Sequence, residues 1–236
     1  MKKLSILFST AIILFFTSCE RVVGEGELRT ETRTTSSFTG VEGQVSGNVF
    51  YKQGPENKVE LTAQQNILNV IETPIVNNKL VIRFKNNVQV REHELITIRV
   101  TAPTISSIGS SGSGNVTVSS SLAANTLTFN LSGSGNMTLP TVTASHLEAS
   151  ISGSGNISIA GGSTNTEKLK ISGSGTVNAQ NLVSKSATTT TSGSGNIRVH
   201  ASETLDVTIS GSGSVFYLGN PLINTNISGS GKVIHL

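Results

Sequence analysis

The sequence is poor in several residue types, and each shortage excludes a class of protein. It contains one cysteine and no tryptophan, and only 13% of its 236 residues are charged. A single cysteine excludes an internal disulfide framework and a zinc site built from several cysteines. Low charge combined with 36% hydrophobic residues argues against a charged disordered chain. Glycine is frequent, at 24 residues, but it has no three-residue period, which excludes collagen.

The chain opens with what resembles a lipoprotein export signal. Two lysines follow the initiator methionine, and residues 4–16 form an apolar run that is shorter than the roughly 20 residues of a membrane-spanning helix. The residues at 16–19, Phe-Thr-Ser-Cys, resemble the lipobox of bacterial lipoproteins. The resemblance implies cleavage before Cys19 and attachment of acyl chains such as palmitate, which would anchor the chain to a membrane. An ordinary secretory signal with an incidental cysteine is the alternative.

Removal of a signal peptide over residues 1–18 changes the charge balance. Two of the 17 basic residues leave, so the remaining chain carries 15 Lys and Arg against 14 Asp and Glu, a net charge of +1. No basic run interleaved with aromatic residues is present, and we therefore expect no nucleic-acid partner. Residues 19–37 are polar and are predicted to form a flexible, lipidated tether. The expected location is the bacterial cell envelope, as an exported lipoprotein anchored to the outer membrane.

A repeated tetrapeptide dominates the second half of the sequence. Ser-Gly-Ser-Gly begins at positions 111, 132, 152, 172, 192, 210 and 228, so the successive spacings are 21, 20, 20, 20, 18 and 18. A nearly constant period of this size is typical of solenoids. The flanking segments alternate apolar with polar residues, as at Leu127, Phe129 and Leu131, which indicates β-strands with one buried face. The sequence therefore predicts an all-β protein, a single-stranded parallel β-helix with ~18–21 residues per coil.

The tetrapeptide has two structural interpretations. If the alternation runs straight through it, Gly133 and Gly135 point inward and the serines point outward. Otherwise it forms a corner in which one glycine takes a positive φ. Either way, identical hydroxyls and amides stack from coil to coil. This surface ladder either binds a ligand or only shapes the turn, and its members are Ser132, Ser134, Asn136, Ser152, Ser154, Asn156, Ser192, Ser194 and Asn196.

The first part of the repeat region is irregular. We predict one β-helix domain over residues 38–236, with atypical coils at 38–110 and Ser-Gly-Ser-Gly coils at 111–236. Residues 45–49, Val-Ser-Gly-Asn-Val, look like a worn copy of the repeat. Most of the charge also lies before residue 111. An atypical first coil is expected because the open edge of a solenoid must be capped.

Several features together resemble a bacterial family, the putative auto-transporter adhesin, head GIN domain. They are the lipobox-like start, Phe-Thr-Gly-Val-Glu-Gly-Gln-Val-Ser-Gly-Asn-Val at 38–49, Lys-Val-Glu-Leu at 58–61, Asn-Lys-Leu-Val-Ile-Arg at 78–83, and the Ser-Gly-Ser-Gly coils. The resemblance covers residues 38–236. It implies a right-handed β-helix that is exported and has an adhesin-like role, and it implies no catalytic residues.

Residues that could support catalysis or bind a metal are scattered along the sequence. The carboxylates of the regular coils are Glu148, Glu167, Glu203 and Asp206, whereas β-helices that cleave glycans need a local cluster of such groups. Glu-His-Glu at 92–94 is the densest ionisable group, and an exposed loop explains it better than a metal or acid–base site. We therefore expect no enzyme activity, no catalytic residues, no cofactor and no metal.

The sequence is interpreted as a non-enzymatic, lipid-anchored protein of the cell envelope, an adhesin or a scaffold that binds a glycan or another surface. Phe216 and Tyr217 interrupt the polar pattern, and Tyr217 marks either a carbohydrate contact or packing at an edge. The expected partners are the membrane, through the lipid anchor, a glycan or surface protein, and a second copy of the chain at its last coil. Two alternatives stay open, a carbohydrate-active β-helix enzyme and a purely structural envelope protein.

Overall fold

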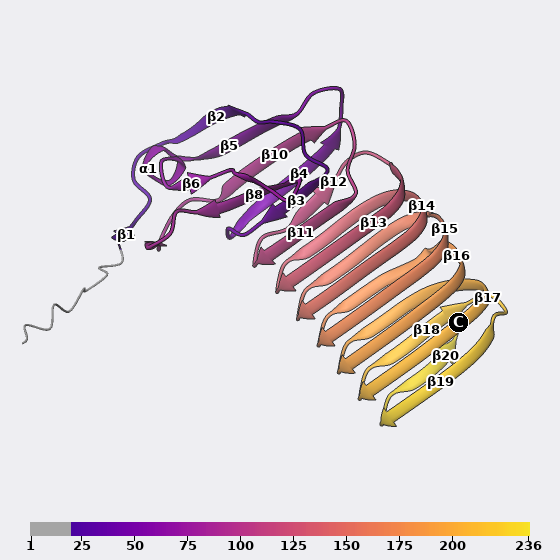
Figure 1. Ribbon diagram of the computed structural model, residues 1–236. Helices are drawn as coiled ribbons and strands as arrows, with labels where there is room; N and C mark the ends of the chain where they lie inside the picture. Colours follow the sequence, from indigo (N-terminus) through magenta and orange to yellow (C-terminus); the bar gives the residue numbers. More distant parts are fainter. Residues whose placement is uncertain (1–19) are drawn as a thin grey trace, which may run out of the picture.

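The computed structural model describes residues 20–236, which form a β-solenoid of about six turns (Figure 1). Strands account for 72% of the structure and helix for 2%, which confirms the predicted all-β parallel β-helix. The coils stack along one axis, with an irregular N-terminal part at one end (Figure 1). The predicted signal peptide, residues 1–18, and the predicted lipidation site, Cys19, lie outside the described residues. No helix in the described chain has the length and apolar character to cross a membrane.

The regular coils are built from parallel strands that pair in register with copies of themselves. Ser132 pairs with Ser152, and Ser152 pairs with Ser172. Each coil therefore stacks on its neighbour at the usual strand spacing of ~4.8 Å, with like residues above one another. The strands are β13 (Leu122–Gly133), β14 (Asn136–Gly153), β15 (Asn156–Gly173), β16 (Thr176–Gly193), β17 (Asn196–Gly211), β18 (Ser214–Leu218), β19 (Leu222–Gly229) and β20 (Lys232–His235).

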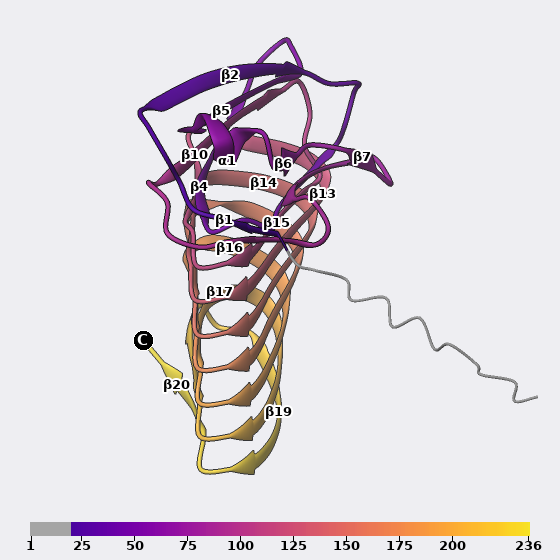
Figure 2. The ribbon, with the colours of Figure 1, turned by 90° about the vertical axis from the view of Figure 1, so that its left-hand side faces the viewer.

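Each coil is flattened and has two faces that meet at the Ser-Gly-Ser-Gly corner (Figure 2). Pro140 and Ser145 interrupt the pairing of β14 with β15 where the chain turns from one face to the other. Face A is formed by the segments that come after the corner in the sequence. They are residues 47–53, 96–102, 115–119, 136–140, 156–160, 176–180, 196–200, 214–218 and 232–235. Face B is formed by the segments that come before the corner in the sequence. They are residues 40–43, 79–84, 107–112, 127–133, 147–153, 167–173, 187–193, 205–211 and 223–229.

The hydrophobic core lies between the two faces. Every second residue of a strand points inward, so each inward position forms a column along the solenoid. Met137, Ile157 and Val177 stack in one buried column of face A, and Leu131, Ile151 and Ile171 form such a column on face B. Burial of one aliphatic side chain contributes about 1.5–3 kcal/mol. The alternation predicted from the sequence is therefore the pattern that holds the coils together.

The last coils are shorter than those before them, and the turn between the faces absorbs the difference. Asn178 of β16 pairs with Arg198 of β17 on face A, and Ser186 pairs with Thr204 where face B begins. Two register shifts separate these pairs. Both faces and the corner thus keep their register, and only the turn becomes shorter.

The N-terminal part joins the solenoid through two strands and closes its end with antiparallel pairs. β4 pairs in parallel with β12, with Val49 opposite Val116, so the worn copy at 45–49 aligns with the repeats. β5 pairs antiparallel with β2 and β10, and β8 pairs antiparallel with β6 and β7. The elements are β1 (Glu20–Val22), β2 (Leu28–Thr34), β3 (Gly40–Gly43), β4 (Gly47–Gln53), β5 (Lys58–Gln64), α1 (Gln65–Leu68), β6 (Ile71–Glu72), β7 (Ile75–Val76), β8 (Lys79–Phe84), β9 (Val88–Val90), β10 (Ile96–Ala102), β11 (Ser107–Gly112) and β12 (Val116–Val118).

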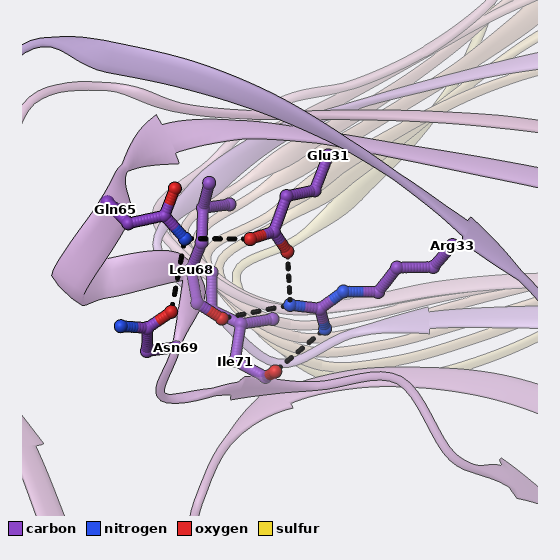
Figure 3. A network of polar contacts seen from close by, with 6 residues as sticks. All are labelled: Glu31, Arg33, Gln65, Leu68, Asn69 and Ile71. Carbon is purple, nitrogen blue, oxygen red and sulfur yellow. Dashed lines mark hydrogen bonds and ion pairs between the residues drawn. The ribbon is translucent and has the colours of Figure 1, made fainter.

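The predicted flexible tether is wrong for residues 20–22 and 28–34, which form strands β1 and β2. β2 pairs with β5 over seven residues. Arg33 on β2 donates to the carbonyl oxygens of Ile71 at 2.7 Å and Leu68 at 2.9 Å and lies 3.2 Å from Glu31, which accepts a hydrogen bond from Gln65 at 2.8 Å (Figure 3). The segment is polar because its contacts are backbone pairs and hydrogen bonds. A lack of apolar residues therefore does not indicate a tether here.

Candidate binding surface at the solenoid corner

The Ser-Gly-Ser-Gly corner requires each of its glycines for a steric reason. Gly193 has a φ of +119°, in a region that favours glycine. A Cβ atom on Gly193 would lie 2.5 Å from the carbonyl oxygen of Gly173, and a Cβ atom on Gly195 would lie 2.6 Å from the carbonyl oxygen of Gly175. Because consecutive coils approach this closely, no side chain fits at either position.

Each sequence interpretation of the tetrapeptide describes part of the observed corner. The positive φ of the first glycine confirms the corner. The alternation also persists through it, since Ser192 and Ser194 are exposed and Gly195 is buried. The N–H groups of Ser194 and Gly195 both donate to the carbonyl oxygen of Gly173 at 3.0 Å. These bonds join one coil to the next and fix the serines on the outside.

The serine members of the ladder present free hydroxyl groups. All six are exposed, and none of their hydroxyls forms a hydrogen bond with another residue of the described chain. The rigid backbone beneath them fixes their spacing at one strand repeat of ~4.8 Å. The corner therefore displays a regular row of donors and acceptors that is open to an external ligand. These serines are Ser132, Ser134, Ser152, Ser154, Ser192 and Ser194.

The asparagine members are instead bonded to one another. Asn136 donates from Nδ2 to Oδ1 of Asn115 at 3.0 Å, and Asn156 donates from Nδ2 to Oδ1 of Asn136 at 2.9 Å. Asn196 Oδ1 accepts a hydrogen bond from the N–H of Ser214 at 3.0 Å. Many of the hydrogen-bonding groups of these asparagines are thus paired within the protein. This supports the interpretation that the asparagine column shapes the coil.

A shallow groove of about 310 Å³ runs along the corner on face B. Its floor is formed by Leu131, Ile151 and Ile171, and two rows of polar residues form its walls. One wall is a row of serines from the tetrapeptides, and the other includes Lys170, which lies 3.1 Å from Glu148. The groove crosses four coils, so a ligand that lies in it would meet the same hydroxyl repeated along its length. The wall residues are Ser132, Ser152, Ser172 and Ser192 on one side and Asn130, Ser150, Lys170 and Thr190 on the other.

The carboxylates named as catalytic candidates do not form one site. Glu148 points outward on face B, and Glu167 is buried inside the solenoid. Glu203 is exposed in the turn between the faces, and residues 92–94 belong to the N-terminal part. Within residues 20–236 no group of three or more His, Cys, Asp or Glu could hold a metal ion. These carboxylates thus lie in different parts of the described fold and do not form the local pair that acid–base chemistry on a glycan uses.

Two features of the described chain were not predicted from the sequence. Burial raises the pKa of Glu167 to about 8, because the low-dielectric core disfavours its charged form. Arg99 and Arg198 lie over the rings of Phe50 and Phe216 on face A. The register of the regular coils was the signal that could have found the burial of Glu167 and the pairing of Arg198 with Phe216. It could not have found Arg99 beside Phe50, because that pair lies in the irregular N-terminal part.

Tyr217 packs at an edge of the core. Its ring centroid lies 4.8 Å from that of His235 in the last strand, and the tyrosine is half-buried. This position favours packing over a carbohydrate contact at Tyr217. The neighbouring Phe216 points to the opposite side of the strand, toward Arg198.

The fold and the repeated corner place the protein among the β-solenoids. Within this class the chain belongs to the family described as putative auto-transporter adhesin, head GIN domain, which matches residues 37–221. The match includes the atypical N-terminal coils and all but the last of the Ser-Gly-Ser-Gly corners. A comparison with curated proteins found no match.

Several solved structures have the same fold. A putative adhesin from Bacteroides fragilis NCTC 9343 is 24% identical, with a TM-score of 0.84, and the match covers 91% of this chain and 100% of that one. A putative lipid binding protein from Parabacteroides distasonis ATCC 8503 is 24% identical, with a TM-score of 0.76 over 92% and 100% of the chains. A putative adhesin from Parabacteroides merdae ATCC 43184 is 22% identical, with a TM-score of 0.75 over 92% and 99%. At these identities the likeness shows the fold alone.

Proposed function

We propose that the protein is a non-enzymatic adhesin of the bacterial cell envelope that binds a glycan or another cell surface through the outside of its solenoid. The observation that carries this proposal is the row of exposed serine hydroxyls along the corner groove, none of which has a partner among residues 20–236. Membership of an adhesin-like family supports it. A rigid row of repeated hydroxyls suits a repetitive ligand, because each coil offers the same contact.

The proposal includes a lipid anchor at Cys19 and a location at the outer membrane. The lipobox-like residues 16–19 support the anchor. Glu20, the next residue, pairs with Val88, and its N–H donates to the carbonyl oxygen of Asn87 at 2.8 Å. The proposed anchor at Cys19 would thus be attached one residue before a paired strand. The regular coils would extend away from the membrane, with their faces accessible to a ligand.

A second copy of the chain is a proposed partner at the other end of the solenoid. All eight residues of β19 are exposed, including the apolar Leu222, Ile223 and Ile227. Apolar side chains beside an open strand edge favour association.

The test compares glycan-array and cell-surface binding for two double variants that remove the same number of hydroxyls. Ser152→Ala with Ser172→Ala removes two hydroxyls from the groove. Ser121→Ala with Ser163→Ala removes two exposed hydroxyls elsewhere, neither of which forms a hydrogen bond within the described chain. The proposal expects binding by the wild type and by the second variant, and at least a severalfold loss in the first. Blank arrays and no cell binding by the wild type would overturn it.

A further inference from the structure

The strands of face A carry positive charge only. They contain Lys52, Arg99, Arg198 and Lys232 and no aspartate or glutamate, whereas the strands of face B contain four Lys or Arg and four Asp or Glu. None of the four face A cations lies within 4.0 Å of a carboxylate of residues 20–236. These four cations thus form no ion pair within the described chain and are available to an anionic ligand.

One outward column of face A contains two arginine–phenylalanine pairs, one at its start and one near its other end. The Arg99 guanidinium carbon lies 5.7 Å from the ring centroid of Phe50, and that of Arg198 lies 5.1 Å from the centroid of Phe216. The two arginines are six strand spacings apart, about 29 Å at ~4.8 Å per strand. The strand register gives the order of the column as Arg99, Phe50, Thr117, Thr138, Ser158, Asn178, Arg198, Phe216 and Ile234.

The column between the pairs is polar and uncharged. Its four residues, from Thr117 to Asn178, have small hydroxyl or amide side chains. A ligand could therefore follow the column from one pair to the other and meet hydrogen-bonding groups at each step. Arg198 is held in place at its end of the column, since Nη1 donates to Oε1 of Gln180 at 3.4 Å.

The first pair borders a hollow of about 340 Å³. Phe50 is 37% exposed in it, so part of its ring is open to a ligand. The one carboxylate at the hollow is Glu60, which lies opposite Arg99 in the antiparallel pairing of β5 with β10. Its ion pair is with Lys58 at 3.0 Å and not with Arg99. The polar and aromatic residues of the hollow are Phe50, Tyr51, Lys52, Glu60, Arg99, Thr101 and Ser119.

We propose that face A binds a linear polysaccharide that carries carboxylate groups, laid along the solenoid axis between the two arginine–phenylalanine pairs. Guanidinium groups match carboxylates in a bidentate geometry. Phenyl rings stack on the C–H faces of sugar rings, and the hydroxyl and amide column between the pairs binds sugar hydroxyls. The inference rests on the proposed function, because it names a ligand class for the same surface protein, and it adds a site distinct from the serine groove.

The low density of positive charge on face A favours such a polysaccharide over a nucleic acid. Face A spans nine strands, about 38 Å at ~4.8 Å per step, and carries four Lys and Arg over this length. Duplex DNA has one negative charge per ~1.7 Å of axis, or about 22 charges over the same length. Most of the phosphates would lack a partner. A polymer with widely spaced carboxylates and many hydroxyls matches the face better.

The separation of the pairs predicts that affinity depends on ligand length. A polysaccharide shorter than six strand spacings, about 29 Å, can contact only one of the two arginine–phenylalanine pairs, and a longer one can contact both. Simultaneous contact converts the second binding event into an intramolecular one, which can raise affinity by orders of magnitude. The length at which affinity rises is therefore set by the distance between Arg99 and Arg198.

The experiment measures binding of the mature chain to hyaluronan fragments of graded length by calorimetry or biolayer interferometry. Dextran serves as the uncharged polymer and duplex DNA as the phosphate polymer. Arg99→Ser with Arg198→Ser removes both guanidinium groups. Lys168→Ser with Lys185→Ser is the matched control, because it removes the same charge from outside face A. Phe50→Ala with Phe216→Ala leaves the charge unchanged and tests the rings.

We expect hyaluronan binding that rises at least tenfold once the fragments are long enough to span both pairs. The arginine and phenylalanine variants should each lose at least tenfold, and the lysine variant should match the wild type. Equal losses in the arginine and lysine variants, equal affinity for DNA, or no dependence on length would overturn the inference. If hyaluronan fails to bind while the serine-dependent binding on arrays persists, the inference fails and the proposed function stands. If the wild type binds no glycan or cell in either assay, both fail.

Discussion

Glu167 pairs in register with Leu147 of the preceding coil, so a carboxyl occupies a core position that a leucine fills one turn earlier. The residue is buried, and neither carboxyl oxygen has a hydrogen-bond partner among residues 20–236. The nearby hydroxyl of Ser184 donates to the carbonyl oxygen of His200 at 3.0 Å. Burial raises the pKa of Glu167 to about 8. The carboxyl is thus mainly protonated at neutral pH.

The first prediction is that stability falls as pH rises. Glutamate in the unfolded chain ionises near pH 4.5, whereas the folded pKa of Glu167 is about 8. The folded state therefore binds more protons between these values, and its free energy of unfolding falls across this window. The expected loss between pH 5 and pH 8 is about 3 kcal/mol. Urea unfolding at the two pH values measures it.

Two matched variants assign this loss to one carboxyl. Glu167→Gln keeps the side-chain volume and removes the ionisation, so its stability should be nearly the same at pH 5 and pH 8. Glu148→Gln changes a partly exposed glutamate on face B, which pairs with Lys170 at 3.1 Å, and should keep the pH dependence of the wild type. Persistence of the full dependence in Glu167→Gln would contradict the prediction.

A second prediction concerns the corner glycines. Gly195→Ala places a Cβ atom 2.6 Å from the carbonyl oxygen of Gly175, closer than real Cβ contacts, so consecutive coils must separate. We expect a loss of about 2–4 kcal/mol in the free energy of unfolding, by analogy with overpacked sites. Ser194→Ala in the same corner is exposed and should stay within about 0.5 kcal/mol of the wild type. Chemical denaturation of both variants provides the test, and equal stability of the two would contradict it.

The period of the tetrapeptide predicted most of the fold. Because each residue pairs with its copy one coil later, the spacing of the repeats fixed the strand register, and the apolar alternation fixed the inward columns. The N-terminal part could not be predicted in this way. β2 is held by backbone pairs with β5 and by Arg33, whose partners are carbonyl oxygens of residues 68 and 71. Contacts to backbone atoms leave no apolar pattern in a sequence.

The candidate site was predicted only in part, for a related reason. The sequence placed Ser152 and Asn156 on one outward ladder, and the structure shows that the serine is free and the asparagine is bonded to its neighbours. Residue type and spacing do not distinguish these two states. The arginine–phenylalanine pairs join Phe50 with Arg99, which lie far apart in the sequence, because β10 returns to lie beside β4. That return is made by irregular coils, which the repeat does not describe.

A third prediction tests the asparagine column. Asn136→Ala removes the hydrogen bond to Asn115 at 3.0 Å and the acceptor of the hydrogen bond from Asn156 at 2.9 Å. Each such bond contributes about 0.5–1.5 kcal/mol, and the exposed position favours the lower end. The expected loss is about 1–2 kcal/mol in equilibrium unfolding. Asn181→Ala, an exposed asparagine without a hydrogen bond from its side chain to the described chain, is the control and should have no measurable effect.

A fourth prediction tests the order of β2. Arg33→Ala removes two hydrogen bonds to the backbone, at 2.7 Å to Ile71 and 2.9 Å to Leu68. Charged donors to carbonyl oxygens contribute about 1.5–3 kcal/mol each. We expect faster hydrogen exchange across β2 and β5, together with a loss of at least about 3 kcal/mol in the free energy of unfolding. Arg29→Ala lies on the same strand, is exposed, and should leave the exchange unchanged. Fast hydrogen exchange of β2 in the wild-type chain would contradict this prediction and support the flexible tether predicted from the sequence.

The last prediction concerns the anchor. Cys19→Ala should abolish labelling with radioactive palmitate and move the protein from the membrane fraction to the soluble fraction, because the chain has no other cysteine. Glu20 is already fixed to residues 87 and 88, so the wild-type N-terminal part should also be protected from protease at the membrane, whereas β19 should be accessible. Equal labelling of the variant would show that the lipid is attached elsewhere. Loss of labelling with unchanged membrane retention would show that another contact holds the protein there.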